Sequence, residues 1–496
     1  MYAILPLLLL ICGAYLAYAF GRLEKAYGKK HLAAGTALAS FAAALVVQLW
    51  LAFDVWRVGT ILYTIGGTTL GMSALSVFLS IVALGLGSVV CLYSVSYMSE
   101  DKGLEYYYPL LLLMVAGILG IGLATDLLVL YLSFELMAIP SYALVAFRRS
   151  EWRSVEAGMK YIVMSGVGSV LAFFGLSLIY MQAGTLTFGA LVGTMHASVL
   201  MQAALVFIIA GFGVKAAMAP LHTWLPDAHS AAPSGISAML SGIVIAAGFL
   251  TLLRTAMVFS GAGLGVGEVL TVMALLTMTV GNLMAYVQTA HQKPDLKRIL
   301  AYSSVAQMGY IMLGIGVGMA YGIRAGYEGG LFHIMTHAFM KGLAFLCAGV
   351  LIHQIGTRYV DEMRGAGLSM KFTGFALALA LLSLAGVPPL SGFMSEWLVF
   401  SGSIQAYSFI GAWAILIAAI ALLNAVLSLG YYLPIIKTLY LGSKDKKVIK
   451  ARDPSTIMVV AMAILLALTI ILGIWPELGL MAVKPVVDGM AAMGGI

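Results

Sequence analysis

Residues Lys215 to Met239 read KAAMAPLHTWLPDAHSAAPSGISAM and lie between two long apolar runs. The stretch contains three prolines, two histidines, an aspartate and a tryptophan, and no basic residue follows Lys215 within it. Because proline cannot continue a helix, the sequence predicts that the helix carrying Lys215 stops at Pro220. Irregular backbone at membrane depth is tolerated only where it is buried in protein or faces water, so we expect the stretch to line a polar cavity. Broken helices of this kind are typical of ion sites.

The composition places the chain among polytopic membrane proteins. Of its 496 residues, 62% are hydrophobic and 9% are charged, whereas about a quarter of the residues of a soluble protein are charged. The first 20 residues are apolar and a basic segment follows without a small-residue cleavage site, so we expect a retained first span and not a removed signal peptide. Three cysteines at unrelated spacings indicate neither disulfides nor a metal or iron–sulfur site. We therefore expect no metal and no cofactor in this chain.

At about 20 apolar residues per span, the sequence predicts an all-α fold of about fourteen transmembrane helices. The first seven are predicted at Tyr2–Phe20, Leu32–Phe53, Met72–Tyr97, Tyr108–Ala124, Asp126–Phe147, Ala157–Met181 and Met201–Ala219. The other seven are predicted at Ser234–Val258, Val269–Val287, Ile299–Ala320, Gly329–Ile355, Phe372–Ser401, Ala406–Tyr440 and Ser455–Ile474.

The basic residues predict the orientation of these spans. Most of the 27 Lys and Arg residues fall in the odd-numbered loops, in the clusters Arg22–Lys30, Arg148–Lys160, Lys293–Arg298, Arg358–Lys371 and Lys437–Arg452. Lys and Arg collect on the cytoplasmic side, so we predict a multi-pass protein of the cytoplasmic (inner) membrane with both termini outside. The net charge of +7 then reflects orientation and not nucleic-acid binding, because no basic cluster is interleaved with aromatic residues.

Glu135, in YLSFELMAIPSYAL, and Lys215 lie inside predicted spans. An unpaired charge in the hydrocarbon region is costly, so both residues are functional candidates. Glu135 needs a cationic or hydrogen-bonding partner or must stay protonated, and Lys215 is the obvious partner. Two structural alternatives stay open: a salt bridge that locks two helices together, and a lysine that extends its side chain to the membrane interface.

The segment LFHIMTHAFMKGLAFL is the third candidate site, because His333, His337 and Lys341 recur in it every four residues. On a helix they form one slowly drifting stripe spanning about 12 Å of rise. Histidine changes its charge near neutral pH, so this spacing is typical of a proton relay. A zinc helix would require HExxH, whose glutamate is missing here, and two histidines on one face cannot clamp a haem. Histidines hydrogen-bonded in a bundle core are the remaining alternative.

A second proline break is predicted in LAGVPPLSGFMSEWLVF, where Pro388 and Pro389 interrupt the twelfth span and Glu396 follows. This pattern repeats that of the seventh span. Since the two spans are five apart, we predict two five-helix repeats of inverted topology. The predicted units are a three-helix segment at 1–107, a first repeat (spans 4–8) at 108–260, a second repeat (spans 9–13) at 261–441, and a cytoplasmic loop with the last span at 442–496.

Five segments, in order, resemble the signature stretches of the antiporter-like subunits: FELMAIPSY, PLHTWLPDAHSAAPS, DLKRILAYSSVAQMGY, HIMTHAFMKGLAFL and GVPPLSGFMSEW. That family includes the three large pumping subunits of respiratory complex I, the D and A subunits of Mrp-type Na+/H+ antiporters, and matching subunits of membrane-bound group 4 hydrogenases. The resemblance covers most of the chain, from about residue 126 to residue 440.

The resemblance implies a role for each matching residue. It makes Glu135 the fifth-helix glutamate that pairs with the seventh-helix lysine, Lys215. His222 and His229 correspond to the histidines beside the seventh-helix break. The eleventh-helix relay corresponds to His333, His337 and Lys341, and the twelfth-helix terminal residue to Glu396. One position departs from the family: many members carry a lysine in the eighth helix, where this chain has Ala246 in SGIVIAAGFLTLLR. Either water and the histidines bridge that gap, or this copy does not conduct along the full central axis.

The function implied is translocation of H+, and possibly of Na+ against H+, with no redox catalysis in this chain. The glutamate in GFMSEW resembles hydrogenase-linked and complex I-type members. We therefore expect a subunit of a redox-driven complex of the group 4 hydrogenase or complex I type, with the hydrogenase type preferred. Its expected partners are other membrane subunits, a peripheral redox arm and lipid. The alternatives are the D subunit of an Mrp-type Na+/H+ antiporter, a non-conducting scaffold copy, and a stand-alone solute transporter, which would need a substrate pocket.

Overall fold

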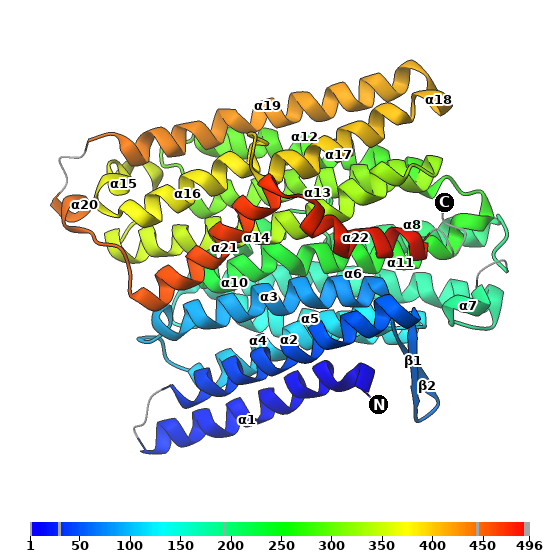
Figure 1. The fold of residues 1–496 in the computed structure, drawn as a ribbon, viewed down its shortest axis with the longest axis horizontal. Helices are drawn as coiled ribbons and strands as arrows, with labels where there is room; N and C mark the ends of the chain where they lie inside the picture. The colour runs from blue at the N-terminus through cyan, green and yellow to red at the C-terminus, as the bar shows by residue number, and fades with distance from the viewer. Residues whose placement is uncertain (1, 28–30, 192–193, 443–445, 491–496) are drawn as a thin grey trace.

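The computed structural model describes residues 2–27, 31–191, 194–442 and 446–490. Its helices run roughly along one direction and form a wide bundle (Figure 1). Helices α1 (Leu5–Tyr27) and α2 (Leu32–Val58) lie along one edge, α19 (Ala412–Tyr440) lies along the opposite edge, and α14 (Arg324–Ile355) lies between them. The polar residues of interest belong to this middle region.

The remaining helices differ widely in length. The longer ones are α3 (Ala74–Tyr97), α4 (Leu104–Leu123), α5 (Leu127–Val145), α6 (Trp152–Ala183), α8 (Val199–Lys215), α11 (Ile245–Ala256), α12 (Val266–Thr289), α13 (Leu296–Tyr321), α16 (Lys371–Leu384), α17 (Ser391–Gln405), α21 (Thr456–Ile474) and α22 (Glu477–Met490). The short ones are α7 (Phe188–Leu191), α9 (Trp224–Ala231), α10 (Ser234–Met239), α15 (Ala366–Ser369), α18 (Tyr407–Ile410) and α20 (Lys446–Lys450). Three 3-10 segments, η1 (Tyr2–Ile4), η3 (Met257–Ala262) and η4 (Val360–Met363), and one π-helical segment, η2 (Leu240–Val244), are the other helical elements of the described residues.

Local sequence explains where several helices begin. The Asp126 carboxylate accepts a hydrogen bond from the Val129 amide at 2.8 Å and caps α5. The Asp295 carboxylate accepts from the first amides of α13, and the Ser198 hydroxyl accepts from the Met201 amide in α8. Each cap satisfies backbone donors that have no partner inside the helix.

The structure confirms a polytopic α-helical membrane protein. In the described part of the chain, twelve helices are long and apolar enough to cross a membrane, or thirteen if one pair bent by 118°, Val360–Ser369 with Lys371–Leu384, counts as a span. The seventh and twelfth predicted spans are not among the twelve, and both contain a helix break. Helix α8 ends at Lys215, five residues before Pro220, and α16 ends at Leu384 before the two prolines.

A two-stranded antiparallel hairpin departs from the all-α prediction. Strands β1 (Ile61–Ile65) and β2 (Thr68–Met72) pair across the turn formed by Gly66 and Gly67. The signal was present, because two residues that adopt positive φ between two β-branched runs are typical of a hairpin. A count of apolar residues alone does not detect this hairpin.

Burial separates central helices from peripheral ones. The most apolar 18 residues are buried throughout in α14 and in the continuous helix Ser234–Phe259, which contains α10, η2 and α11. Only 39%, 33% and 28% of the corresponding windows are buried in α1, α2 and α19. Charged side chains on the central helices therefore cannot reach lipid and must find partners inside the bundle.

Candidate functional site

Lys215 is the last residue of α8 and is completely buried. Its ammonium donates hydrogen bonds to the Ser141 hydroxyl at 3.0 Å and to the Tyr161 hydroxyl. It also lies 4.7 Å from the ring centroid of Tyr142 and 4.4 Å from that of Tyr161. Cation–π contacts compensate part of the cost of removing the charge from water. The alternative in which the side chain of Lys215 extends to the membrane interface is therefore wrong.

Glu135, on α5, is half-buried and accepts a hydrogen bond from the Ser169 hydroxyl. Both Glu135 and Lys215 are described, and no ion pair joins them. The two groups lie at different positions along the axis of α5. The Lys215 ammonium is hydrogen-bonded to Ser141, which is six residues, or about 9 Å of helical rise, beyond Glu135. The carboxylate is still close enough to act electrostatically on Lys215. The direct pairing that the resemblance implied is thus not formed in this conformation.

Hydroxyl groups on α6 occupy the space between the two charges. Tyr161, Ser165 and Ser169 are spaced by four residues and so lie on one face of α6. The Tyr161 hydroxyl is bonded by Lys215, the Tyr142 hydroxyl donates to Ser165 at 2.7 Å, and Ser169 donates to Glu135. This ladder was not predicted, although the four-residue spacing in YIVMSGVGS is visible in the sequence.

The break after α8 is closed by tight packing. The Trp224 indole donates to the Val214 carbonyl at 2.8 Å, and its ring stacks on Tyr161 at 3.9 Å. This bond satisfies one of the carbonyls that a helix end leaves without a partner. On the far side, Gly248 of the eighth predicted span lies against the Lys215 side chain, because a Cβ there would meet it at 3.0 Å.

His222 and His229 lie in the break and in α9, as predicted, and both are buried. His229 stacks on Phe345 of α14 with ring centroids 4.8 Å apart. Among the described residues, neither ring nitrogen of His229 has a hydrogen-bond partner, nor does Nδ1 of His222. The ring of His229 lies within electrostatic range of Lys341 and of Lys297. His229 therefore connects α9 with the centre of the bundle.

His333, His337 and Lys341 lie on α14, and all three are completely buried. The rings of the two histidines are 6.2 Å apart and nearly parallel. His333 is hydrogen-bonded to Ser395 and to Gln307, each at 2.8 Å. Both ring nitrogens of His337 lack a partner in the described structure. His333 thus fits the bundle-core alternative, whereas the unsatisfied ring of His337 does not.

Lys341 is connected to the eighth predicted span by hydrogen bonds that run through α13. Its ammonium donates to the Leu300 carbonyl at 2.9 Å and to the Ser303 hydroxyl. The same carbonyl accepts from Ser304, whose hydroxyl lies 2.7 Å from that of Ser241 in η2. Ala246 is completely buried and is the second residue of α11, directly after η2. A hydroxyl of Ser241, and not an amine, is therefore the polar contribution of this helix to the Lys341 site.

Glu396, on α17, is 2% exposed and lies in the second turn of the helix that follows the second break. Its carboxylate interacts with Gln307, the residue that also bonds His333. Gly386, within the break, has φ +68 and lies so close that a Cβ on it would clash with the Glu396 Oε2 atom. The carboxylate beside a proline break is therefore present as predicted, and Gln307 joins it to His333.

The close approach of Gly386 to Glu396 gives a testable prediction. We expect Gly386→Ala to lower ion transport about fivefold, because the added methyl group displaces the carboxylate; the left-handed backbone costs about a further 1 kcal/mol. The matched control is Gly356→Ala, which has the same kind of backbone (φ +80) and no atom near the added Cβ. Equal transport in the two variants, measured by proton flux into proteoliposomes, would contradict the importance of the contact.

Comparison with known proteins identifies the family. Residues 124–422 match the family described as NADH:quinone oxidoreductase/Mrp antiporter, and residues 67–108 match that described as the N-terminus of chain 5 of NADH-ubiquinone oxidoreductase (complex I). The F(420)H(2) dehydrogenase subunit N of Methanosarcina mazei is 33% identical over 428 residues, which is 84% of each chain. NADH-quinone oxidoreductase subunit N of Desulforamulus reducens is 32% identical over 408 residues, covering 80% of this chain and 81% of the relative.

A solved structure supports the same assignment. A chain of the membrane-bound sulfane sulfur reductase, an archaeal respiratory membrane complex, superposes with a TM-score of 0.88 at 25% identity, covering 100% of this chain and 99% of the other. The matched family region contains all eight predicted site residues, from Glu135 to Glu396. The chain therefore belongs to the antiporter-like membrane subunits of the NADH:quinone oxidoreductase and Mrp antiporter family.

Proposed function

We propose that this chain translocates protons as one membrane subunit of a multisubunit, redox-driven complex of the NADH-quinone oxidoreductase or F(420)H(2) dehydrogenase type. The observation that carries the proposal is a set of ionisable groups fully withdrawn from lipid in the middle of the bundle: Lys215, His229, His333, His337, Lys341 and Glu396 are each at most 2% exposed. Buried charges of this kind mark ion pathways in membrane proteins. Because both relatives are subunits named N, the complex I type is favoured over the group 4 hydrogenase type.

The architecture proposed for this function has fourteen spans in two inverted repeats, 108–260 and 261–441. Its support is that α8 with α9, and α16 with α17, are each separated by a short non-helical segment beside a buried charge. Counting each interrupted pair as one span adds the seventh and twelfth spans to the twelve continuous helices. We further propose that both termini face the outside of the cytoplasmic membrane, since Lys and Arg favour the cytoplasmic side.

Electrostatic coupling between Glu135 and Lys215 supplies the proposed mechanism. Two unit charges attract by about 2 kcal/mol at 9 Å and about 4 kcal/mol at 4 Å, at an effective dielectric constant of about 20. A movement that shortened the separation of the two charges from about 9 Å to about 4 Å would therefore favour the charged form of Lys215 by about 2 kcal/mol, which is more than tenfold in its protonation equilibrium. A conformational change that opens and closes this gap would thus make Lys215 bind and release a proton. The proton would then pass to the next of the buried ionisable groups named above, which we call the buried string.

Glu135→Gln tests this function. We expect proton flux into proteoliposomes that contain the purified complex, driven by a potassium diffusion potential, to fall about fivefold, or by about 1 kcal/mol. The matched control is Glu100→Gln, which removes an exposed carboxylate in the turn after α3. Unchanged flux in the Glu135 variant would refute the proposal, and a dependence of the flux on Na+ would assign Na+ as a second coupling ion.

The second candidate function is a non-conducting scaffold within such a complex. The observation that favours it is Ala246, which leaves the eighth span without a titratable group in its buried middle. In this case the variants of Glu135, Lys215 and Lys341 would all assemble and would leave flux unchanged. A stand-alone solute carrier would instead purify without other membrane subunits.

A further inference from the structure

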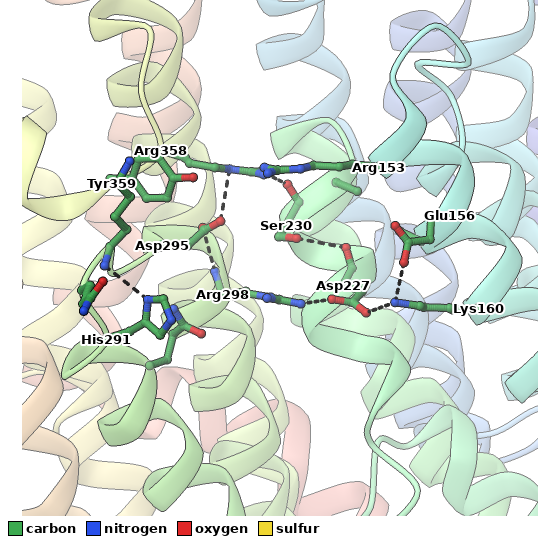
Figure 2. Close-up of a pocket in the computed structure, with 15 residues that line it drawn as sticks. Arg153, Glu156, Lys160, Asp227, Ser230, His291, Asp295, Arg298, Arg358 and Tyr359 are labelled. Atoms are coloured by element: carbon green, nitrogen blue, oxygen red, sulfur yellow. Dashed lines mark hydrogen bonds and ion pairs between the residues drawn. The ribbon is translucent and has the colours of Figure 1, made fainter.

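Three of the basic loops converge on one cavity at the end of the bundle (Figure 2). Its volume is about 560 Å³, and its walls come from the first turns of α6, from α9, from the end of α12, from the start of α13 and from the segment after α14. Five cationic side chains line it: Arg153, Lys160, Lys293, Arg298 and Arg358. We call it the basic cavity. By the preference of Lys and Arg for the cytoplasmic side, it opens toward the cytoplasm.

The carboxylates of the basic cavity are already engaged by these cations. Asp227 forms ion pairs with Lys160 at 2.9 Å and with Arg298, Glu156 pairs with Lys160 at 2.8 Å, and Asp295 pairs with Arg358 at 3.1 Å. Burial opposes ionisation of Asp227, but the hydrogen bond from Lys160 and the charge and hydrogen bond of Arg298 outweigh it and lower its pKa. Asp227 therefore joins α9 to α6 and α13 through its two ion pairs and holds the wall of the cavity together.

Lys297 lies just inward of this cavity. Its neighbours in sequence, Asp295 and Arg298, both line the cavity, whereas Lys297 itself is only 3% exposed. Its ammonium donates to the Ala232 carbonyl at 2.6 Å, and no carboxylate in the described structure pairs with it. Asp295 and Glu151 act favourably on its charge from a distance, and Arg358 and Arg148 act against it. A buried cation with no ion-paired carboxylate is costly, and release of the proton removes this cost. A lysine in this position is therefore suited to accept a proton and pass it on.

The inward neighbour of Lys297 is His229. Ala232, the hydrogen-bond acceptor of Lys297, follows α9 three residues after His229. The ring of His229 lies within electrostatic range of both Lys297 and Lys341, and both of its nitrogens lack partners among the described residues. His229 is also within electrostatic range of His337. One residue thus separates Lys297 from the string of buried groups on α14.

We infer that Lys297 is the residue through which protons pass between the basic cavity and the buried string. This rests on the proposed function of proton translocation. In the inward step, a hydronium ion in the cavity gives its proton to the neutral amine of Lys297, leaving water and an ammonium group. The ammonium then transfers the proton to an unprotonated ring nitrogen of His229 and returns to the neutral amine, so no other reactant is consumed.

The structural alternative is that Lys297 only clamps the carboxyl end of α9 through the Ala232 carbonyl. The two roles respond differently to arginine. A guanidinium group retains a cation and several donors but does not release its proton at physiological pH. A clamp would therefore be rescued by Lys297→Arg, whereas a proton-transferring residue would not.

The experiment compares Lys297→Met and Lys297→Arg with Lys437→Met, which removes an exposed lysine on α19 that lies outside the basic cavity. Proteoliposomes with the purified complex receive a potassium diffusion potential, and proton flux is followed with an internal pH indicator. We expect both Lys297 variants to lose flux about fivefold or more, and Lys437→Met to stay within about twofold of the unaltered chain. Subunit composition and thermal melting in detergent identify any variant that fails to assemble.

A second measurement does not depend on altering Lys297. Ala231 lines the basic cavity and is half-buried, so Ala231→Cys offers a thiol there. A bulky, charged thiol reagent, applied to vesicles oriented with the cytoplasmic face outward, should block flux in this variant and leave the unaltered chain, with its own cysteines, active. The inference is overturned if Lys297→Arg has the flux of the unaltered chain. It is also overturned if the labelled Ala231→Cys chain and Lys297→Met both have that flux.

These outcomes separate the inference from the proposed function. If Lys297→Met conducts normally while Glu135→Gln does not, proton translocation stands and the access residue is elsewhere. If Glu135→Gln also conducts normally, the proposed function itself fails.

Discussion

Lys341→Met is expected to reduce proton flux more than tenfold, about 1.4 kcal/mol or more in the transport barrier. Lys341 is completely buried and ends the ladder of titratable groups on α14. Its ammonium donates to the Leu300 carbonyl and the Ser303 hydroxyl, through which it contacts α13. Methionine is similar in length and apolar, so it fills the space but carries no proton. Flux into proteoliposomes is the measurement.

Thermal melting distinguishes this role from a structural one. Exchanging a buried charged group for an apolar side chain of similar volume is often neutral or stabilising. We therefore expect Lys341→Met to melt at or above the temperature of the unaltered complex, with Lys437→Met as the surface control. A variant that melts lower and still conducts would contradict the relay and would make Lys341 a structural residue.

The two helix breaks illustrate what composition and proline spacing can predict. A polar, proline-containing stretch after Lys215 and the pair Pro388-Pro389 each predicted an interruption, and α8 and α16 do end before them. The ends lie several residues earlier than predicted, at Lys215 and Leu384. Proline removes the bond to the residue four positions back and crowds that turn, so the helix ends before the proline is reached.

The site was predictable where its spacing is local. His333, His337 and Lys341 share one face of one helix because of a four-residue repeat, and the structure places all three in the core. Contacts between helices were not predictable from spacing. The bonds of Lys215 to Ser141 and Tyr161 depend on the depth of α8 relative to α5 and α6. A single sequence contains no information on that depth.

Lys297 was missed for a related reason. The cluster Lys293–Arg298 was predicted to lie in a cytoplasmic loop, since Lys and Arg collect on the cytoplasmic side. The structure begins α13 at Leu296, capped by Asp295, and this turns Lys297 inward toward Ala232. Lys293, before α13, and Arg298, in its first turn, both line the basic cavity. A helix start therefore decides which of several adjacent cations is buried.

Lys215→Ala is the second variant for which we expect a loss of more than tenfold in proton flux, about 1.4 kcal/mol or more. The ammonium is buried among Ser141, Tyr142 and Tyr161, and no other lysine or arginine in the described structure bonds to these side chains. Removing it interrupts the link between the hydroxyl ladder of α6 and the rest of the bundle. Proton flux is again the measurement, and Lys437→Ala is the surface control.

The double variant Glu135→Gln with Lys215→Ala tests whether the two residues act as one unit. Independent contributions would multiply, so losses of about fivefold and tenfold would combine to about fiftyfold. In the proposed mechanism Glu135 acts only through the protonation of Lys215, so the double variant should lose no more flux than Lys215→Ala alone. Multiplied losses would mean that Glu135 serves a separate path. Equal losses would show that a carboxylate about 9 Å along α5 from the level of the lysine still controls it.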